Sequence, residues 1–100
     1  MRQTQRPPNY RVLLHNDAVN KREYVVQVLL KVVDGMSLER AYDIMSEAHQ
    51  YGLALVLITV QEEAESICES LRNNGLVSTV EPDSGGRRGA GGDGGGGGDA

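Results

Sequence analysis

YRVLLHNDAVNKRE, residues 10–23, begins with an apolar segment and continues through a polar corner toward a helix. Tyr10, Val12 and Leu14 occupy alternate positions, which is typical of a strand with one buried face. The alternation ends at Leu14, where the chemistry of the chain changes. We therefore expect a strand over residues 9–14 that holds the polar corner at its tip.

The polar corner itself, His15, Asn16 and Asp17, has two interpretations. Asn and Asp side chains bond to their own backbone, so the corner can simply be a turn. Alternatively, a rigid strand presents two acceptor side chains to a ligand that carries hydrogen-bond donors. The residues alone leave both interpretations open. Asn20, with Glu23 three positions later, matches a capping box and predicts a helix start beyond the corner.

Two helices are expected after the corner. The first should cover residues 21–33 and end at Gly35, a natural left-handed cap. Its apolar stripe consists of Val25, Val28, Leu29 and Val32. Ser37 should cap the second helix, which continues to about residue 49 and is ended by Gly52. The inner face of the second helix consists of Leu38, Ala41, Met45 and Ala48.

A second apolar run, LALVLITV at residues 53–60, is hydrophobic at both odd and even positions. This pattern predicts a strand near the middle of a sheet. Thr59 and Glu62 form a capping box for a third helix over residues 61–74. An Asn-Gly turn then leads to a last short strand over residues 76–81.

The predicted order is β-α-α-β-α-β, an α+β class in two layers. Helices should cover one face of a three-stranded antiparallel sheet. The core domain is expected over residues 9–82, preceded by a flexible polar arm over residues 1–8. Residues 83–100 are dominated by Gly and cannot bury apolar surface, so we expect a disordered tail there.

Composition excludes several functional classes. The net charge is −4 and the chain has no Phe or Trp, which argues against nucleic-acid binding. Cys68 is the only cysteine, so we expect a reducing environment and a core position for it. No apolar run is long enough to span a membrane, and the first nine residues lack the apolar segment of a secretory signal. No common catalytic motif and no cofactor-binding motif is found.

Several short motifs occur together within residues 10–82. They are VLLHND at 12–17, EYVV at 23–26, ERA at 39–41, MxxAH at 45–49 followed by Gly52, and TVE at 79–81. Together they resemble the ClpS family, adaptors that hand N-degron substrates to a Clp AAA+ unfoldase and its protease. NKREYVVQVL, residues 20–29, resembles the plastid and cyanobacterial members. The resemblance implies the plastid stroma, or the cytoplasm if the source is bacterial.

The resemblance also implies a binding site with two parts. The free α-amino group of a substrate would be received by Asn16, Asp17 and His49. The pocket for its first side chain would be formed by Arg22, Val25, Met45, Ala48 and Leu76. An ammonium has three donors and one charge, so acceptors with a carboxylate among them suit it. Such a site binds substrates that begin with Phe, Tyr, Trp or Leu and needs no nucleophile, so we expect no enzyme activity.

The implied partner is the N-terminal domain of a Clp unfoldase of the ClpA or ClpC type, contacted through Glu62. The chain itself is expected to be a monomer. It departs from the family pattern at three positions. Ala18 replaces a second acidic residue of many bacterial members, and Arg22 replaces a Met at the pocket entrance. Ile67 replaces a Lys one helical turn after the acidic contact residue.

Two alternatives belong to other functional classes. A ribosomal-stalk C-terminal domain has a similar order of elements and binds translation factors. It would carry a Lys-rich exposed helix and a preceding Gly/Ala hinge, whereas this chain has an acidic third helix and a Gly-rich run at its end. A small zinc-dependent enzyme is the other alternative, with His15, Asp17 and His49 as the candidate ligands.

Overall fold

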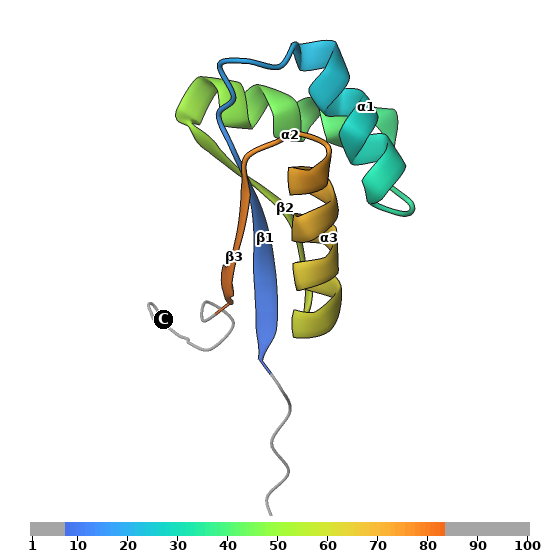
Figure 1. The fold of residues 1–100 in the computed structure, drawn as a ribbon, viewed down its shortest axis with the longest axis vertical. Helices are drawn as coiled ribbons and strands as arrows, with labels where there is room; N and C mark the ends of the chain where they lie inside the picture. Colours follow the sequence, from blue (N-terminus) through green and yellow to red (C-terminus); the bar gives the residue numbers. More distant parts are fainter. Residues whose placement is uncertain (1–7, 84–100) are drawn as a thin grey trace, which may run out of the picture.

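The computed structural model describes residues 8–83, which contain the expected order of elements (Figure 1). The elements are β1 (Asn9–His15), α1 (Arg22–Val32), α2 (Leu38–Tyr51), β2 (Leu53–Val60), α3 (Gln61–Asn73) and β3 (Ser78–Pro82). The β-α-α-β-α-β prediction is confirmed. The arm and tail predicted at the two ends lie outside the described residues, except for Pro8 and Asp83.

The sheet has the order β2-β1-β3, and both pairings are antiparallel. The central strand is therefore β1, in which Val12, Leu13 and Leu14 are all buried. The prediction that residues 53–60 lie near the middle of the sheet is wrong, because β2 pairs with β1 alone. Its apolar outer face stays open instead, and Ile58 is 43% exposed.

A β-bulge adapts β2 to the core. Val12 pairs with Leu57 and Leu13 pairs with Leu55, so Val56 is the additional residue of the bulge. Val56 is nevertheless buried in the hydrophobic core. Ala54 and Val56 alternate on the buried face, and Leu57, the residue directly after Val56, also packs partly buried against the core.

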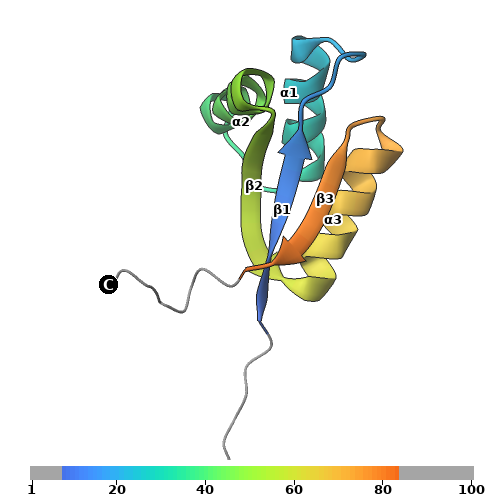
Figure 2. The ribbon, with the colours of Figure 1, turned by 90° about the vertical axis from the view of Figure 1, so that its left-hand side faces the viewer.

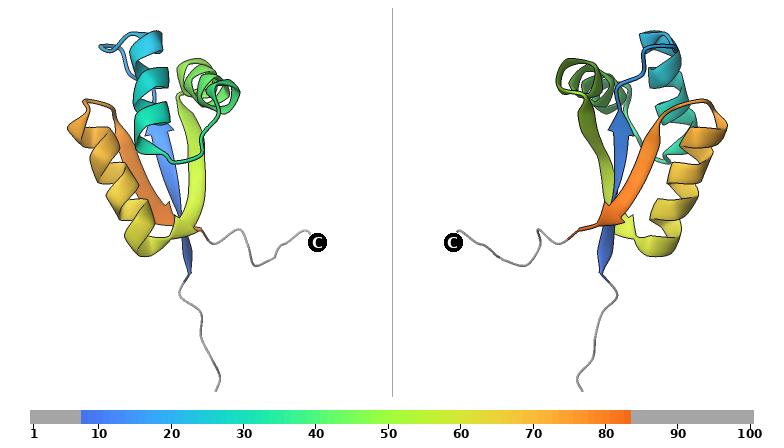
Figure 3. Two further views of the ribbon diagram at one scale, coloured as in Figure 1. Left: turned by 90° about the vertical axis from the view of Figure 1, so that its right-hand side faces the viewer. Right: turned by 60° about the vertical axis from the view of Figure 1, so that its left-hand side comes forward.

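The helices cover one face of the sheet and close one of its ends. In Figure 2 the helix α3 lies behind β1 and β3, and the left view of Figure 3 shows α1 and α3 in front of the sheet. The helix α1 packs on α2 and α3, near the end where β1 stops and β2 starts (Figure 1). The largest fully buried apolar side chains are Val12, Leu14, Leu29, Ile44 and Leu71. Cys68 joins this core as a buried free thiol, as predicted.

The predicted ends of α2 are confirmed, although the helix runs two residues further than expected. Ser37 Oγ accepts a hydrogen bond from the backbone N–H of Arg40 at 3.0 Å. Gly52 has φ +87° and its N–H donates to the carbonyl of Ala48. A side chain with a Cβ would be strained at this φ, so the position favours Gly.

Both predicted capping boxes are wrong. The N-cap of α1 is Lys21, and the N-cap of α3 is Val60, neither with a side-chain cap bond. The Asn20 amide donates instead to Asp17 and to the carbonyl of Gly75. The Thr59 hydroxyl donates to Glu63 at 2.5 Å. In each case the side chain has a partner other than the free N–H groups of the helix.

The last strand begins two residues later than predicted, at Ser78. The backbone N–H of Leu76 still donates to the carbonyl of Leu71 at 3.1 Å, and Gly75 donates to Arg72. These bonds close the end of α3, and the bonding to β1 begins at Val77, whose carbonyl accepts from the N–H of His15, so the regular strand starts at Ser78. Within residues 8–83, no helix combines the length and the apolar character that a membrane crossing requires.

Candidate functional site

A recess lies where β1 ends, between α1, α2 and the turn before β3. Its walls include every residue that was predicted for the amine site and the side-chain pocket. The acceptor residues are Asn16, Asp17 and His49, and the pocket residues are Arg22, Val25, Met45, Ala48 and Leu76. The structure thus brings together groups that are far apart in the sequence.

Two backbone hydrogen bonds hold the corner in place. The N–H of Asn16 donates to the carbonyl of Gly52 at 3.1 Å, and the N–H of His15 donates to the carbonyl of Val77 at 2.9 Å. Gly52 ends α2, so the first bond fixes the corner beside the last turn of that helix, which carries His49. The second bond fixes it beside the segment that carries Leu76.

The corner is a turn closed by the side chain of Asp17. Its Oδ1 accepts from the N–H of Val19 at 2.8 Å and from the N–H of Asn20 at 3.1 Å, and its Oδ2 accepts from the Asn20 amide. The turn interpretation is therefore confirmed. Burial raises the pKa of Asp17, but the hydrogen bonds from Asn20 and Val19 lower it more, so this pKa lies below its ordinary value. The carboxylate therefore carries its charge at neutral pH.

Asn20 is a wall residue that was predicted only as a helix cap. Its side-chain amide donates to the Asp17 carboxylate and, at 2.9 Å, to the carbonyl oxygen of Gly75. These two bonds connect the corner with the turn before Leu76. In the sequence, Ala18 and Val19 separate Asn20 from the polar corner, so no local pattern assigns it to the recess. Its partner on a segment far along the chain becomes visible only in three dimensions.

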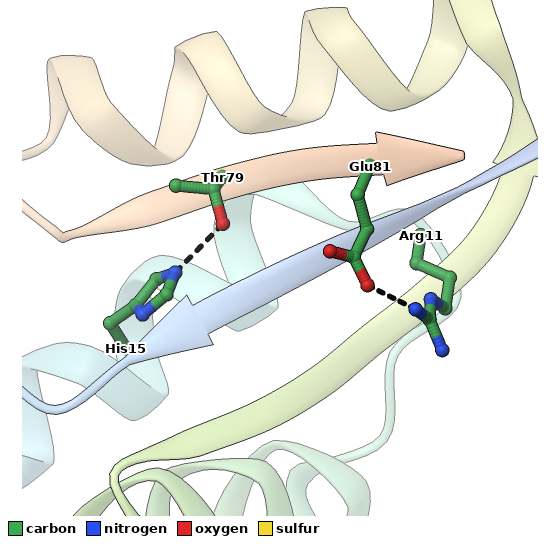
Figure 4. Close-up of polar contacts among 4 residues, drawn as sticks. All are labelled: Arg11, His15, Thr79 and Glu81. Carbon is green, nitrogen blue, oxygen red and sulfur yellow. Dashed lines mark hydrogen bonds and ion pairs between the residues drawn. The ribbon is translucent and has the colours of Figure 1, made fainter. Parts of the chain in front are cut away.

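His15 lines the recess but its ring is engaged on the sheet. The His15 Nε2 lies 2.7 Å from Thr79 Oγ1 on β3, and Figure 4 shows this contact beside the ion pair of Arg11 with Glu81. Within residues 8–83, no group of three or more His, Cys, Asp or Glu side chains is placed to hold a metal ion. The metal site required by the enzyme alternative is not assembled there.

Arg22 and His49 meet across the mouth of the recess. The Arg22 Nη2 donates to the His49 Nε2 at 2.8 Å, so this ring nitrogen acts as the acceptor. The contact joins the first turn of α1 to the last turns of α2. Beneath it, the recess has a volume of about 30 Å³. The apolar wall consists of the buried side chains of Val25, Met45, Ala48 and Leu76.

Glu62 lies apart from the recess, in the first turn of α3. That turn is at the opposite end of the sheet from the tip of β1 (Figure 1). The Glu62 side chain is exposed. Ile67, which replaces a Lys of the family pattern, is only 9% exposed and packs in the core. Its side chain is an uncharged hydrocarbon and is also buried, so it does not replace the Lys at the surface.

Comparison with known proteins gives consistent matches. Residues 5–79 match the family model described as "ATP-dependent Clp protease adaptor protein ClpS". The chain is 61% identical over 79 residues to the chloroplastic "ATP-dependent Clp protease adapter protein CLPS1" of Arabidopsis thaliana. The matched region covers 79% of this chain and 50% of that relative. It is 51% identical over 76 residues to the ClpS protein of Synechococcus elongatus, covering 76% of this chain and 80% of the relative.

The matched relatives are named as adapter proteins, and they come from chloroplasts and cyanobacteria. The chain spans about half the length of the chloroplastic relatives. Among solved structures, Agrobacterium tumefaciens ClpS2 bound to L-phenylalaninamide matches with a TM-score of 0.70 and 34% identity. That match covers 78% of this chain and 100% of the other.

Proposed function

Because the chain belongs to the ClpS family of ATP-dependent Clp protease adaptors, we propose that it binds the free N-terminal residue of substrate proteins. The first residue would be a bulky hydrophobe, and the adaptor would pass the substrate to a Clp AAA+ unfoldase. The observation that carries this proposal is the recess, in which amine acceptors and an apolar wall occur side by side. Family membership leaves the ribosomal-stalk alternative without support.

The polar rim suits an α-ammonium group. Asn16 offers an amide oxygen, Asp17 a carboxylate and His49 an acceptor nitrogen. Together they match the three donors and the single positive charge of the ligand. L-phenylalaninamide, bound by the related ClpS2, has both a free α-amino group and an aromatic side chain. A ligand of this chemistry would place its ring against the apolar wall.

The apolar part of the recess must widen before an aromatic ring can enter. Its volume is about 30 Å³, whereas a cavity of about 150 Å³ is known to hold benzene. Met45 is unbranched and adaptable, and Arg22 is exposed at the mouth. We infer that these two side chains move on binding. Arg22 must then release His49, whose Nε2 becomes available to the ligand.

Arg22 therefore opposes binding, and Arg22→Met is expected to tighten it. The substitution removes the hydrogen bond that occupies His49 and a positive charge beside the incoming ammonium. Either effect amounts to about 1 kcal/mol, so the affinity for a Phe-initiated peptide should rise roughly three- to tenfold. Isothermal titration calorimetry with peptides beginning with Phe or Leu measures the change.

Arg40→Met is the matched control, because Arg40 is exposed on α2 and donates to the carbonyl of Leu55 instead. Its affinity for the same peptides should equal that of the wild type. If Arg22→Met weakens binding, Arg22 supports the ligand, for example by stacking on its ring, and does not compete with it.

The proposed partner is the N-terminal domain of a Clp unfoldase of the ClpC or ClpA type. The exposed carboxylate of Glu62, remote from the recess, is the proposed contact. Substrate and unfoldase can then be bound at the same time by opposite ends of the domain. The relatives are named as adapter proteins, which supports a binding role without catalysis. Because these relatives are chloroplastic or cyanobacterial, we place the protein in the plastid stroma or a bacterial cytoplasm.

Reversing the charge at this contact should separate the two binding activities. Glu62→Lys is expected to weaken binding to the N-terminal domain of a ClpC-type unfoldase about tenfold or more, because a partner surface that is complementary to the carboxylate repels a cation in its place. Its affinity for a Phe-initiated peptide should not change. Glu47→Lys, the same charge change on α2, is the control. Equal unfoldase binding by both variants would remove Glu62 from the interface.

The function as a whole is tested by peptide titration. A peptide that begins with Phe should bind, and the same peptide with an acetylated N-terminus should not.

A further inference from the structure

A second groove lies on the surface between α1 and α2, outside the recess. Its floor is apolar and includes Val26, Leu30, Leu38 and Tyr42. Leu38 is 63% exposed and Tyr42 is 57% exposed, so they contribute little to the stability of the core. The groove has a volume of about 750 Å³, which is room enough for side chains of a bound segment. Nothing in the proposed function so far uses it.

The groove is continuous with the mouth of the recess. Glu23 and Tyr42 line the groove, and they also line the hollow above the recess, together with Arg22 and His49. A polypeptide whose first residue occupies the recess therefore has an open path across this hollow. The path leads between α1 and α2.

The rim of the groove is acidic. Glu23, Glu39 and Asp43 line it, and no Lys or Arg does. All three carboxylates are on exposed residues, so they attract cationic side chains and repel acidic ones over a short range. The complementary ligand is a segment that combines an apolar residue with Lys or Arg.

We propose that this groove is a second subsite for the substrate, which binds an apolar residue with a basic neighbour downstream of the N-terminal residue. The inference rests on the proposed function, because the first residue must anchor the chain in the recess. Once it is anchored, the downstream segment is held near the groove at a high effective concentration. A contact too weak to bind alone then increases the affinity of the whole substrate.

Three peptides of equal length test the subsite. All begin with Phe and a Gly-Ser spacer, followed by Leu-Lys in the first, Ser-Ser in the second and Asp-Asp in the third. The spacer length is varied so that the pair can reach the groove. At the best spacing, Leu-Lys is expected to bind about three- to tenfold more tightly than Ser-Ser, from partial burial of one Leu and a screened charge pair. Asp-Asp should bind most weakly.

Variants of the protein then test whether the higher affinity for the Leu-Lys peptide comes from the groove. Leu38→Ser removes an exposed floor residue that does not line the recess, so it should abolish the advantage of Leu-Lys and leave Ser-Ser binding unchanged. Asp43→Lys should reverse the preference between basic and acidic peptides. Glu47→Lys carries the same type of charge change on α2 outside the groove and should behave like the wild type. Thermal unfolding confirms that each variant is folded.

The proposal is overturned if Leu-Lys and Ser-Ser bind equally at every spacing, or if Leu38→Ser keeps the gain. In both cases the Ser-Ser peptide still binds through its Phe, so the proposed function survives. Failure of all three peptides, with loss of binding for a short Phe peptide too, contradicts the proposed function and the subsite together. A loss of unfoldase binding in Leu38→Ser, with peptide binding unchanged, assigns the groove to that partner and also overturns the proposal.

Discussion

Ala48→Trp is expected to abolish binding of a Phe-initiated peptide. Ala48 is 4% exposed and forms part of the apolar wall, in a recess of about 30 Å³. An indole at this position occupies the space that the substrate ring needs, and the neighbouring core cannot absorb it without strain. The affinity should therefore fall below detection by calorimetry, a loss of at least about a hundredfold.

A series of substitutions of increasing size at Ala48 distinguishes filling of the recess from loss of folding. Ala48→Val and Ala48→Met fill the recess less, so Phe should be lost before Leu as the first residue of the peptide. Glu47→Trp, on the adjacent exposed position of α2, is the control for adding a large ring and should bind normally. If the folded Ala48→Trp protein binds Phe with unchanged affinity, the ligand contacts only the surface and the pocket assignment is wrong.

Asp17→Asn is expected to weaken binding by about 1.5–3 kcal/mol, roughly ten- to a hundredfold, because a hydrogen bond to a charged group is lost. The replacement removes the charge and keeps an oxygen that can accept from the N–H groups of Val19 and Asn20, but its NH2 group cannot accept the bond that Oδ2 takes from the Asn20 amide, so thermal unfolding is measured alongside. Asp34→Asn gives the same change in net charge away from the recess, in the turn between α1 and α2. It should leave the affinity unchanged.

The pH dependence separates the two roles of Asp17. Its lowered pKa means that the turn is stabilised above the ordinary pKa range of Asp, and that this contribution is lost as the pH falls through the lowered value. Mildly acidic solution should therefore leave the turn and the carboxylate charge intact.

If Asp17→Asn and the wild type bind a Phe-initiated peptide with equal affinity at neutral pH, the Asp17 carboxylate does not face the ammonium.

Local signals in the sequence predicted much of the fold. Ser37 and Gly52 mark the ends of α2 because capping and a left-handed backbone depend on the residue itself. The alternation of Tyr10, Val12 and Leu14 predicted β1, because successive side chains of a strand point to opposite faces of the sheet. The site residues came from a family resemblance, and the structure gathers them around one recess. Spacing alone does not reveal that His49 lies beside a corner more than thirty residues earlier.

The wrong predictions concern choices between partners in space. The apolar run at residues 53–60 did not indicate its place in the sheet, because an open sheet face leaves apolar side chains such as Ile58 exposed at an edge. Asn20 and Thr59 have cap-like spacings, but each finds a competing partner. The contact of Arg22 with His49 joins two helices, and no local pattern reports it.

The central claim is that the recess requires a free α-amino group next to a bulky apolar side chain. It is tested most directly by titrating the wild-type protein with two peptides that are identical from Phe onward, one with a free N-terminus and one acetylated. Acetylation removes the positive charge and two of the three donors but keeps the ring. We expect saturable binding of the free peptide and no detectable binding of the acetylated one. Equal affinities for the two peptides would contradict the claim.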